Sequence, residues 1–198
     1  SDERVEMAVN LETLGRVHHS RAEWKQAEQF YNEALAIRRQ VFGQEHSSVA
    51  SCLANLAALK REQGDLKGAV ELYRQVVDIE RRILGPTHAS VALTYNNLAV
   101  LHIFTGNYTE AERLLREALD INRRAHGAES PQVAIGLHNL ARALRPQGRL
   151  AEAEAASRQA LRLLVPERGE DPVRVAVVRE ALARTLCDAG RLQEAEGL

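Results

Sequence analysis

The sequence predicts an all-α fold, a solenoid in which antiparallel helix pairs are stacked one after another. Two observations lead to this prediction: the chain repeats itself every 42 residues, and the apolar positions inside each repeat follow helical spacing. One repeating column is leucine, at Leu14, Leu56, Leu98, Leu140 and Leu182, and another is alanine, at Ala27, Ala69, Ala111, Ala153 and Ala195. A chain of this kind buries the apolar face of each unit against its neighbours.

The repeats are expected to form a single array over residues 1–198. Their predicted bounds are 7–48, 49–90, 91–132 and 133–174, followed by a partial fifth repeat at 175–198. The fifth repeat stops after roughly one turn of its second helix, so we expect the side carrying Leu182 and Leu186 to be incompletely covered unless another segment packs there. We therefore interpret the chain as a fragment of something longer.

The third repeat illustrates the two helices of each unit. Apolar residues at helical spacing from Val91 to His102 predict the first helix, and Gly106 follows it as a residue that accepts a positive φ. A second helix is predicted to begin near Tyr108 and to end before Gly127. Either helix alone would be marginal in water, so the pair is expected to fold as a hairpin.

Small and large side chains alternate where these two helices face each other. Ala111 and Ala118 allow a close approach, and Leu98 and Leu119 fill the space between the helices.

Three places depart from the repeat. Ala22 replaces the glycine of later repeats, Pro146 should bend or end the first helix of the fourth repeat, and Val165-Pro166 should shorten its second helix.

Composition argues against several classes of function. The formal net charge is −1 and aromatic residues make up 4% of the chain, so neither nucleic acid nor a membrane surface is an expected partner. No apolar run is long enough to span a bilayer. Cys52 and Cys187 lack a paired spacing, which favours a reducing compartment and a cytoplasmic location.

Several residues of the third repeat carry a family resemblance. They are Leu98-Ala99, Gly106-Asn107-Tyr108, Ala111-Glu112, Leu115 and Ala118-Leu119. This pattern resembles the tetratricopeptide repeat (TPR), and the 42-residue period with the connector Leu84–His88 is similar to the subtype found in kinesin light chains. The resemblance implies a right-handed superhelix that serves as an interaction module, without implying a motor.

A second stripe on the first helix of the third repeat is the candidate binding surface. It lies opposite the buried stripe and is expected to line a concave groove; its residues are Leu93, Asn96, Asn97, Val100 and Phe104. Asn55, Asn97 and Asn139 recur at one place in successive repeats, where their carboxamides could hold a peptide backbone. TPR families use an asparagine at this place similarly. The alternative is that these asparagines hydrogen-bond across neighbouring repeats.

The later part of this groove is predicted to be locally basic. His138, Arg142 and Arg145, together with Arg184, would suit an acidic segment, although Glu180 and Asp188 offset their charge. Solvated side chains are the alternative explanation.

No candidate catalytic residue, metal site or cofactor emerges from the sequence. The 7 histidines lack an H-x-x-x-H spacing, and neither a phosphate-binding loop nor a nucleophile motif is present. We therefore expect a non-catalytic scaffold that binds a peptide segment of a partner protein in its groove. One alternative is a sensor or autoinhibitory arm of a larger signalling enzyme, such as an ATPase, kinase or protease. Another is a structural homo-oligomer that self-associates through its open C-terminal edge.

Overall fold

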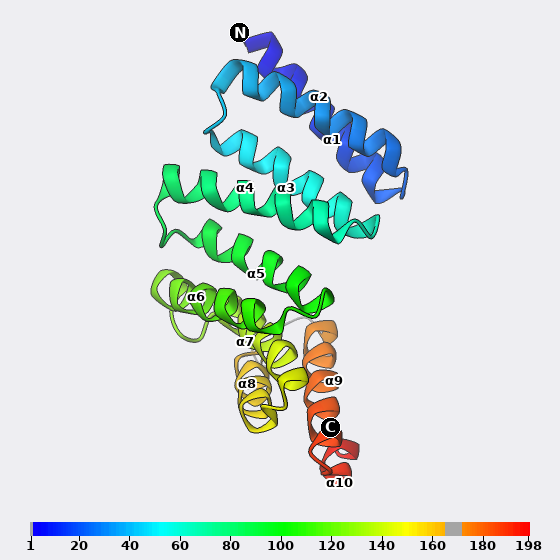
Figure 1. The fold of residues 1–198 in the computed structure, drawn as a ribbon, viewed down its shortest axis with the longest axis vertical. Coiled ribbons are helices and arrows are strands. Elements are labelled where there is room, and N and C mark those ends of the chain that lie inside the picture. The colour runs from blue at the N-terminus through cyan, green and yellow to red at the C-terminus, as the bar shows by residue number, and fades with distance from the viewer. Residues whose placement is uncertain (1, 165–171) are drawn as a thin grey trace. The chain divides into compact units, whose positions relative to one another are not determined.

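The structure, a computed structural model, describes residues 2–164 and 172–198, and this part of the chain consists of helices joined by short connections (Figure 1). The predicted all-α fold is confirmed, whereas Val165-Pro166 lies outside the described residues. In chain order the helices are α1 (Asp2–Ser20), α2 (Trp24–Phe42), α3 (Ser47–Glu62), α4 (Leu66–Leu84), α5 (Ala89–Phe104), α6 (Tyr108–His126), α7 (Pro131–Leu144), the short 3-10 helix η1 (Arg145–Gln147), α8 (Leu150–Leu163), α9 (Pro172–Asp188) and α10 (Leu192–Glu196).

The helices pack in two compact units, Ser1–Thr94 and Tyr95–Leu198. In the first unit α1 packs on α2 and α3 packs on α4, and α2 also contacts α3. In the second unit α7 packs on α8 and α9 packs on α10, with α6 against α7 and α8 against α9. Each hairpin is therefore covered by the next one within its unit, as expected for stacked repeats.

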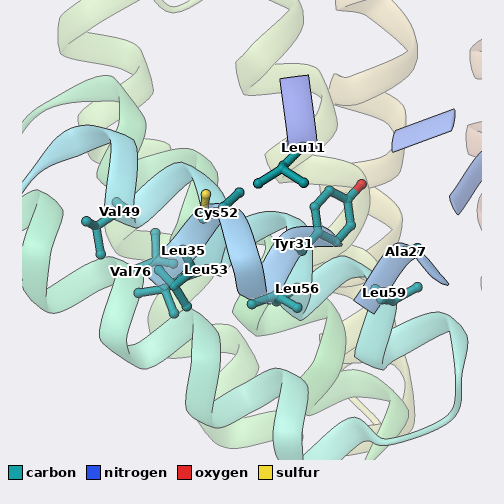
Figure 2. Packing of buried hydrophobic residues seen from close by; sticks show 12 residues of the cluster. Leu11, Ala27, Tyr31, Leu35, Val49, Cys52, Leu53, Leu56, Leu59 and Val76 are labelled. Atoms are coloured by element: carbon teal, nitrogen blue, oxygen red, sulfur yellow. The ribbon is translucent and has the colours of Figure 1, made fainter. Parts of the chain in front are cut away.

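A core cluster of the first unit is formed by side chains from α1, α2, α3 and α4 (Figure 2). Leu11, Tyr31, Leu53 and Val76 come from α1, α2, α3 and α4 in turn and are at most 8% exposed. At Gly15 a side chain would not fit, because a Cβ there would lie 2.6 Å from the Tyr31 ring. This glycine lets α1 and the tyrosine of α2 come into close contact.

The second unit buries the residues that the repeat pattern placed in its core. Leu98 and Leu119 are 5% and 2% exposed, and Ala111 is fully buried. The prediction that the Leu182 and Leu186 side is incompletely covered is wrong, because these residues are 0% and 1% exposed. Helix α9 packs against both α8 and α10, and these two helices bury the leucine side.

The ends of the first helices follow the predicted turn chemistry. Helix α7 ends at Leu144, and the next turn, which contains Pro146, is the 3-10 helix, closed by Gly148 with φ 74°. The equivalent turn of the first repeat keeps this conformation without a glycine, because Ala22 has φ 57°. An alanine in the left-handed region is strained, by about 1–2 kcal/mol.

Replacing Ala22 with glycine is therefore expected to raise the free energy of unfolding. The gain should be roughly 0.5–1 kcal/mol, since the flexibility of glycine in the unfolded chain offsets part of the relieved strain. At the equivalent turn of the second repeat, Gly64→Ala should destabilise the fold, because Gly64 has φ 81°, which strains a residue with a Cβ. The added Cβ would meet no neighbouring atom, so the backbone conformation alone causes this effect. Urea denaturation followed by circular dichroism measures both. An unchanged or lower stability of Ala22→Gly would contradict a left-handed Ala22.

Candidate functional site

Two of the three aligned asparagines join neighbouring first helices. The Asn55 Nδ2 atom donates a hydrogen bond to Glu12 Oε1 at 2.8 Å, from α3 to α1. In the same way Asn139 Nδ2 of α7 donates to Asn96 Oδ1 of α5 at 3.1 Å. These hydrogen bonds are the ones expected if the asparagines connect neighbouring repeats, which was the alternative explanation for their recurrence. Both carboxamides thus have a structural role that does not depend on a ligand.

Asn97 differs from the other two asparagines. Its side chain is half-buried, and no hydrogen bond joins it to any residue in the described ranges. The residue 43 positions before Asn97 in the sequence is Ala54, which has no polar side chain, whereas Glu12 and Asn96 stand 43 positions before Asn55 and Asn139. The two donors and the acceptor of the Asn97 carboxamide therefore have no hydrogen-bond partner among the described residues.

The apolar members of the predicted stripe on α5 are accessible. Leu93 is 63% exposed and Phe104 is 59% exposed, whereas Val100 is half-buried. The two exposed side chains stand about three helical turns apart on α5, so they do not form one continuous apolar patch.

A concave pocket of about 410 Å³ lies in the second unit, between the end of α5, α7 and α9. Four predicted site residues line it: Phe104, His138, Arg142 and Arg145. The prediction missed Val177 of α9, although Val177 stands 84 residues, two full repeats, after Leu93. It also missed Ile103, Tyr108 and Pro146, which line the pocket as well. From the sequence, Tyr108 was interpreted only as the start of a helix and Pro146 only as a residue that ends one, and Ile103 was not considered.

The charges around the pocket are mostly paired. Arg145 Nη1 lies 2.7 Å from Asp188 Oδ2, and Arg184 Nη2 lies 2.6 Å from Glu180 Oε1. These exposed pairs leave little free positive charge at either arginine.

Arg142 is the exception. Its guanidinium lies over the Phe104 ring, 5.8 Å from the centroid, and donates a hydrogen bond to Asn139 Oδ1 at 3.2 Å. No carboxylate among the described residues pairs with it. Burial lowers the pKa of Arg142 from its usual value, as expected for a cation with little compensating charge.

His138 does not add positive charge at neutral pH. Burial, helped by the neighbouring Arg142, lowers the pKa of His138 to about 4. Its Nδ1 atom is buried and has no hydrogen-bond partner in the structure. The basic character predicted for this stretch is therefore confined to Arg142, beside a neutral imidazole that can still form a hydrogen bond.

Other kinds of site receive no support from the described residues. Within residues 2–164 and 172–198, no group of three histidine, cysteine or acidic side chains is arranged to hold a metal ion. Over the same part of the chain, no helix combines the length and the apolar character needed to cross a bilayer. Cys52 is buried and Cys187 is exposed, and both are free thiols. The cytoplasmic location stays a prediction.

Comparison with protein families identifies the class to which this fold belongs. The tetratricopeptide repeat model matches residues 6–82, 55–124, 90–165 and 132–198, which together span nearly the whole chain. The chain is a member of the tetratricopeptide repeat family. Members of this family are generally protein-interaction scaffolds, and the fold is typically non-catalytic.

Solved structures narrow the subtype. Nearly identical TPR-like repeats from Podosopora anserina, described as those of a kinesin light chain, are 27% identical, with a TM-score of 0.82 and coverage of 98% of this chain and 91% of that one. BtubC (BKLC) from P. vanneervenii is 23% identical, with a TM-score of 0.87 and coverage of 98% and 77%. The predicted similarity to kinesin-light-chain repeats is confirmed. No curated protein matches the sequence.

Proposed function

We propose that this chain is a non-catalytic scaffold that binds an extended segment of a partner protein, and that the pocket lined by Phe104 and Arg142 is the centre of the binding site. The observation that supports this most is the unpaired state of Arg142. A half-buried guanidinium without a carboxylate is costly unless something compensates its charge. A ligand carboxylate would do so.

The walls of the pocket define the chemistry of the segment. The guanidinium offers a planar fork that fits a carboxylate with two parallel hydrogen bonds. Next to it, Phe104 and Val177 provide apolar surface. The preferred segment therefore combines an acidic group, which is an aspartate, a glutamate or a chain terminus, with a neighbouring apolar side chain.

The length of the segment follows from the spacing along α5. Asn97 and Phe104 are separated by two helical turns, about 10 Å along the axis. An extended peptide covers this distance with about three residues. We propose that Asn97 holds the ligand backbone through its free carboxamide, three residues away from the acidic group at Arg142. Leu93 and Val100 lie along the same face and extend the apolar contact.

The alternative of a sensor or autoinhibitory arm uses the same surface. In that case the bound segment belongs to the parent enzyme and not to a separate partner. The chemistry of the pocket is the same for both, so the preference for an acidic and apolar segment applies in either case.

A peptide selection tests the proposal directly. A randomised peptide library is panned against the chain, and a recovered peptide is titrated by fluorescence anisotropy. Arg142→Gln is expected to weaken binding at least tenfold, because a charged hydrogen bond contributes about 1.5–3 kcal/mol. The matched control is Arg124→Gln, an exposed arginine on α6, which should change affinity less than twofold. Recovered peptides without an acidic residue, or equal losses for both variants, would contradict the proposal.

A further inference from the structure

His138 of α7 borders two cavities of the second unit. It lines the pocket that contains Arg142, and it also lines a smaller cavity of about 160 Å³ between α7 and α9. The wall of the smaller cavity is almost wholly apolar, whereas the wall of the Arg142 pocket combines polar and apolar groups. A polar atom of His138 that is open to one of the two cavities is therefore open to the Arg142 pocket.

The two ring nitrogens of His138 have different surroundings. The Nδ1 atom is buried and has no hydrogen-bond partner in the structure. The Nε2 atom is not buried in this way, and no hydrogen bond joins it to any residue of the described ranges. Because the smaller cavity exposes almost no polar atom, Nε2 opens towards the Arg142 pocket.

The groups around His138 keep its imidazole ring neutral. Burial, helped by the neighbouring Arg142, lowers the pKa of His138 to about 4. Glu180 of α9 acts in the opposite direction, but its carboxylate is paired with Arg184. Glu180 is the one acidic side chain among the described residues that line the two cavities, and the other charged residues there are cations, Arg145 and Arg174. Near pH 7 the ring therefore carries a hydrogen on one nitrogen only.

The burial of Nδ1 decides which nitrogen carries this hydrogen. On Nδ1, the hydrogen would form a buried N–H donor without an acceptor, an arrangement that costs free energy and is rare in folded proteins. On Nε2, the N–H group reaches the open pocket, where water or a ligand can accept its hydrogen bond. The neutral ring of His138 thus presents an Nε2–H donor to the pocket that also contains the Arg142 guanidinium.

We propose that His138 is a second anchor for the acidic group of the bound segment, and that its Nε2–H group donates a hydrogen bond to the carboxylate that Arg142 holds. This inference rests on the proposed function, because it concerns the same ligand. The two residues stand one helical turn apart on α7, so their side chains lie on the same face of the helix. Both offer only donors to the ligand, and a carboxylate offers only acceptors. A carboxamide fits this pair less well, since its NH₂ group would face a donor.

Nuclear magnetic resonance of the histidine rings tests the form of His138 without any ligand. Long-range correlations between ring protons and ring nitrogens distinguish the two neutral forms from the charged ring. The His138 signals are assigned by their loss in His138→Gln. The expected result is a neutral ring with its hydrogen on Nε2, from about pH 7.5 down to about pH 5.5. A hydrogen on Nδ1, or a charged ring within this pH range, overturns the proposal.

Titration of a recovered acidic peptide tests the contact with the ligand. The amide nitrogen of a glutamine reaches the place of Nε2, so His138→Gln should bind the peptide within about twofold of the parent chain. The shorter asparagine does not reach that place, and His138→Asn should weaken binding by at least about fivefold. Circular dichroism checks that both variants stay folded. If His138→Asn unfolds, His138→Phe replaces it, because it keeps a ring of similar shape without the donor.

A second peptide, in which the acidic group is replaced by the corresponding amide, separates a direct contact from a structural role. His138→Asn should bind this peptide within about twofold of the parent chain, because the hydrogen bond to the carboxylate is already lost. Equal losses for both peptides would show that His138 acts through the fold and would overturn the proposal.

The Arg142→Gln variant distinguishes this inference from the proposed function. If Arg142→Gln weakens binding of the acidic peptide and His138→Asn does not, the anchor role of His138 is wrong and the proposed function stands. If neither variant weakens binding, both are wrong.

Discussion

Replacing Leu98 with alanine is expected to lower the free energy of unfolding by about 2–5 kcal/mol. The side chain is 5% exposed in the second unit, in the leucine column that recurs in every repeat. Removing its isobutyl group takes apolar area out of the core and leaves a cavity that helices held by close contacts refill only in part.

Leu93 provides the matched control for this variant. It lies on the same helix, α5, but is 63% exposed, so Leu93→Ala should change stability by less than about 0.5 kcal/mol. Chemical denaturation of both variants, followed by circular dichroism at 222 nm, measures the difference. If Leu98→Ala costs less than about 1 kcal/mol, the assignment of the leucine column to the core is wrong.

The second large effect is expected at Glu12, which connects three helices of the first unit. One of its oxygens accepts a hydrogen bond from Arg38 on α2, and the other accepts from Asn55 on α3. Arg38 is 8% exposed and also donates to the Ser48 carbonyl at 2.8 Å. Glu12→Gln should therefore destabilise the fold by about 2–4 kcal/mol, because it leaves a buried guanidinium without its counter-charge.

Glu6→Gln is the control for this charge removal. Glu6 lies on α1 and is exposed, so its neutralisation should change stability by less than about 0.5 kcal/mol. Thermal and urea denaturation of the two variants under the same ionic conditions provide the comparison. Equal stabilities of Glu12→Gln and the parent chain would show that the contact with Arg38 contributes nothing to folding.

The repeat period was sufficient to predict the fold and much of the core. Columns such as Leu56 and Leu98 are buried because the same pair of helix contacts recurs in each unit, so one pattern describes them all. The exposed Leu14 shows the limit of this argument. A column predicts burial only where a preceding helix is present, and α1 has none among the described residues.

Details of the candidate site depend on contacts that no single column shows. Asn55 and Asn139 bond to residues 43 positions earlier, one place off the repeat, and Arg145 pairs with Asp188, again 43 positions away. The partner at such a distance is different in every repeat. The sequence therefore predicted where the three asparagines lie, but not that Asn97 is the one among them whose side chain has no hydrogen-bond partner in the described residues.

The charge of the pocket could not be predicted from the sequence either. A histidine and several arginines suggest a basic surface, but the neutral state of His138 results from its burial and from the nearby Arg142. Which arginine stays unpaired depends on where α9 places its carboxylates. These are properties of three packed helices and not of any one segment.

The hydrogen bonds around Arg142 place the proposed ligand site next to a contact between two neighbouring first helices. Arg142 holds Asn139, and Asn139 in turn holds Asn96 on the first helix of the preceding repeat. In the proposed function, an acid bound at Arg142 would compete with Asn139 for the guanidinium. We therefore expect ligand binding to weaken the support that Arg142 gives to the hydrogen bond between Asn139 of α7 and Asn96 of α5.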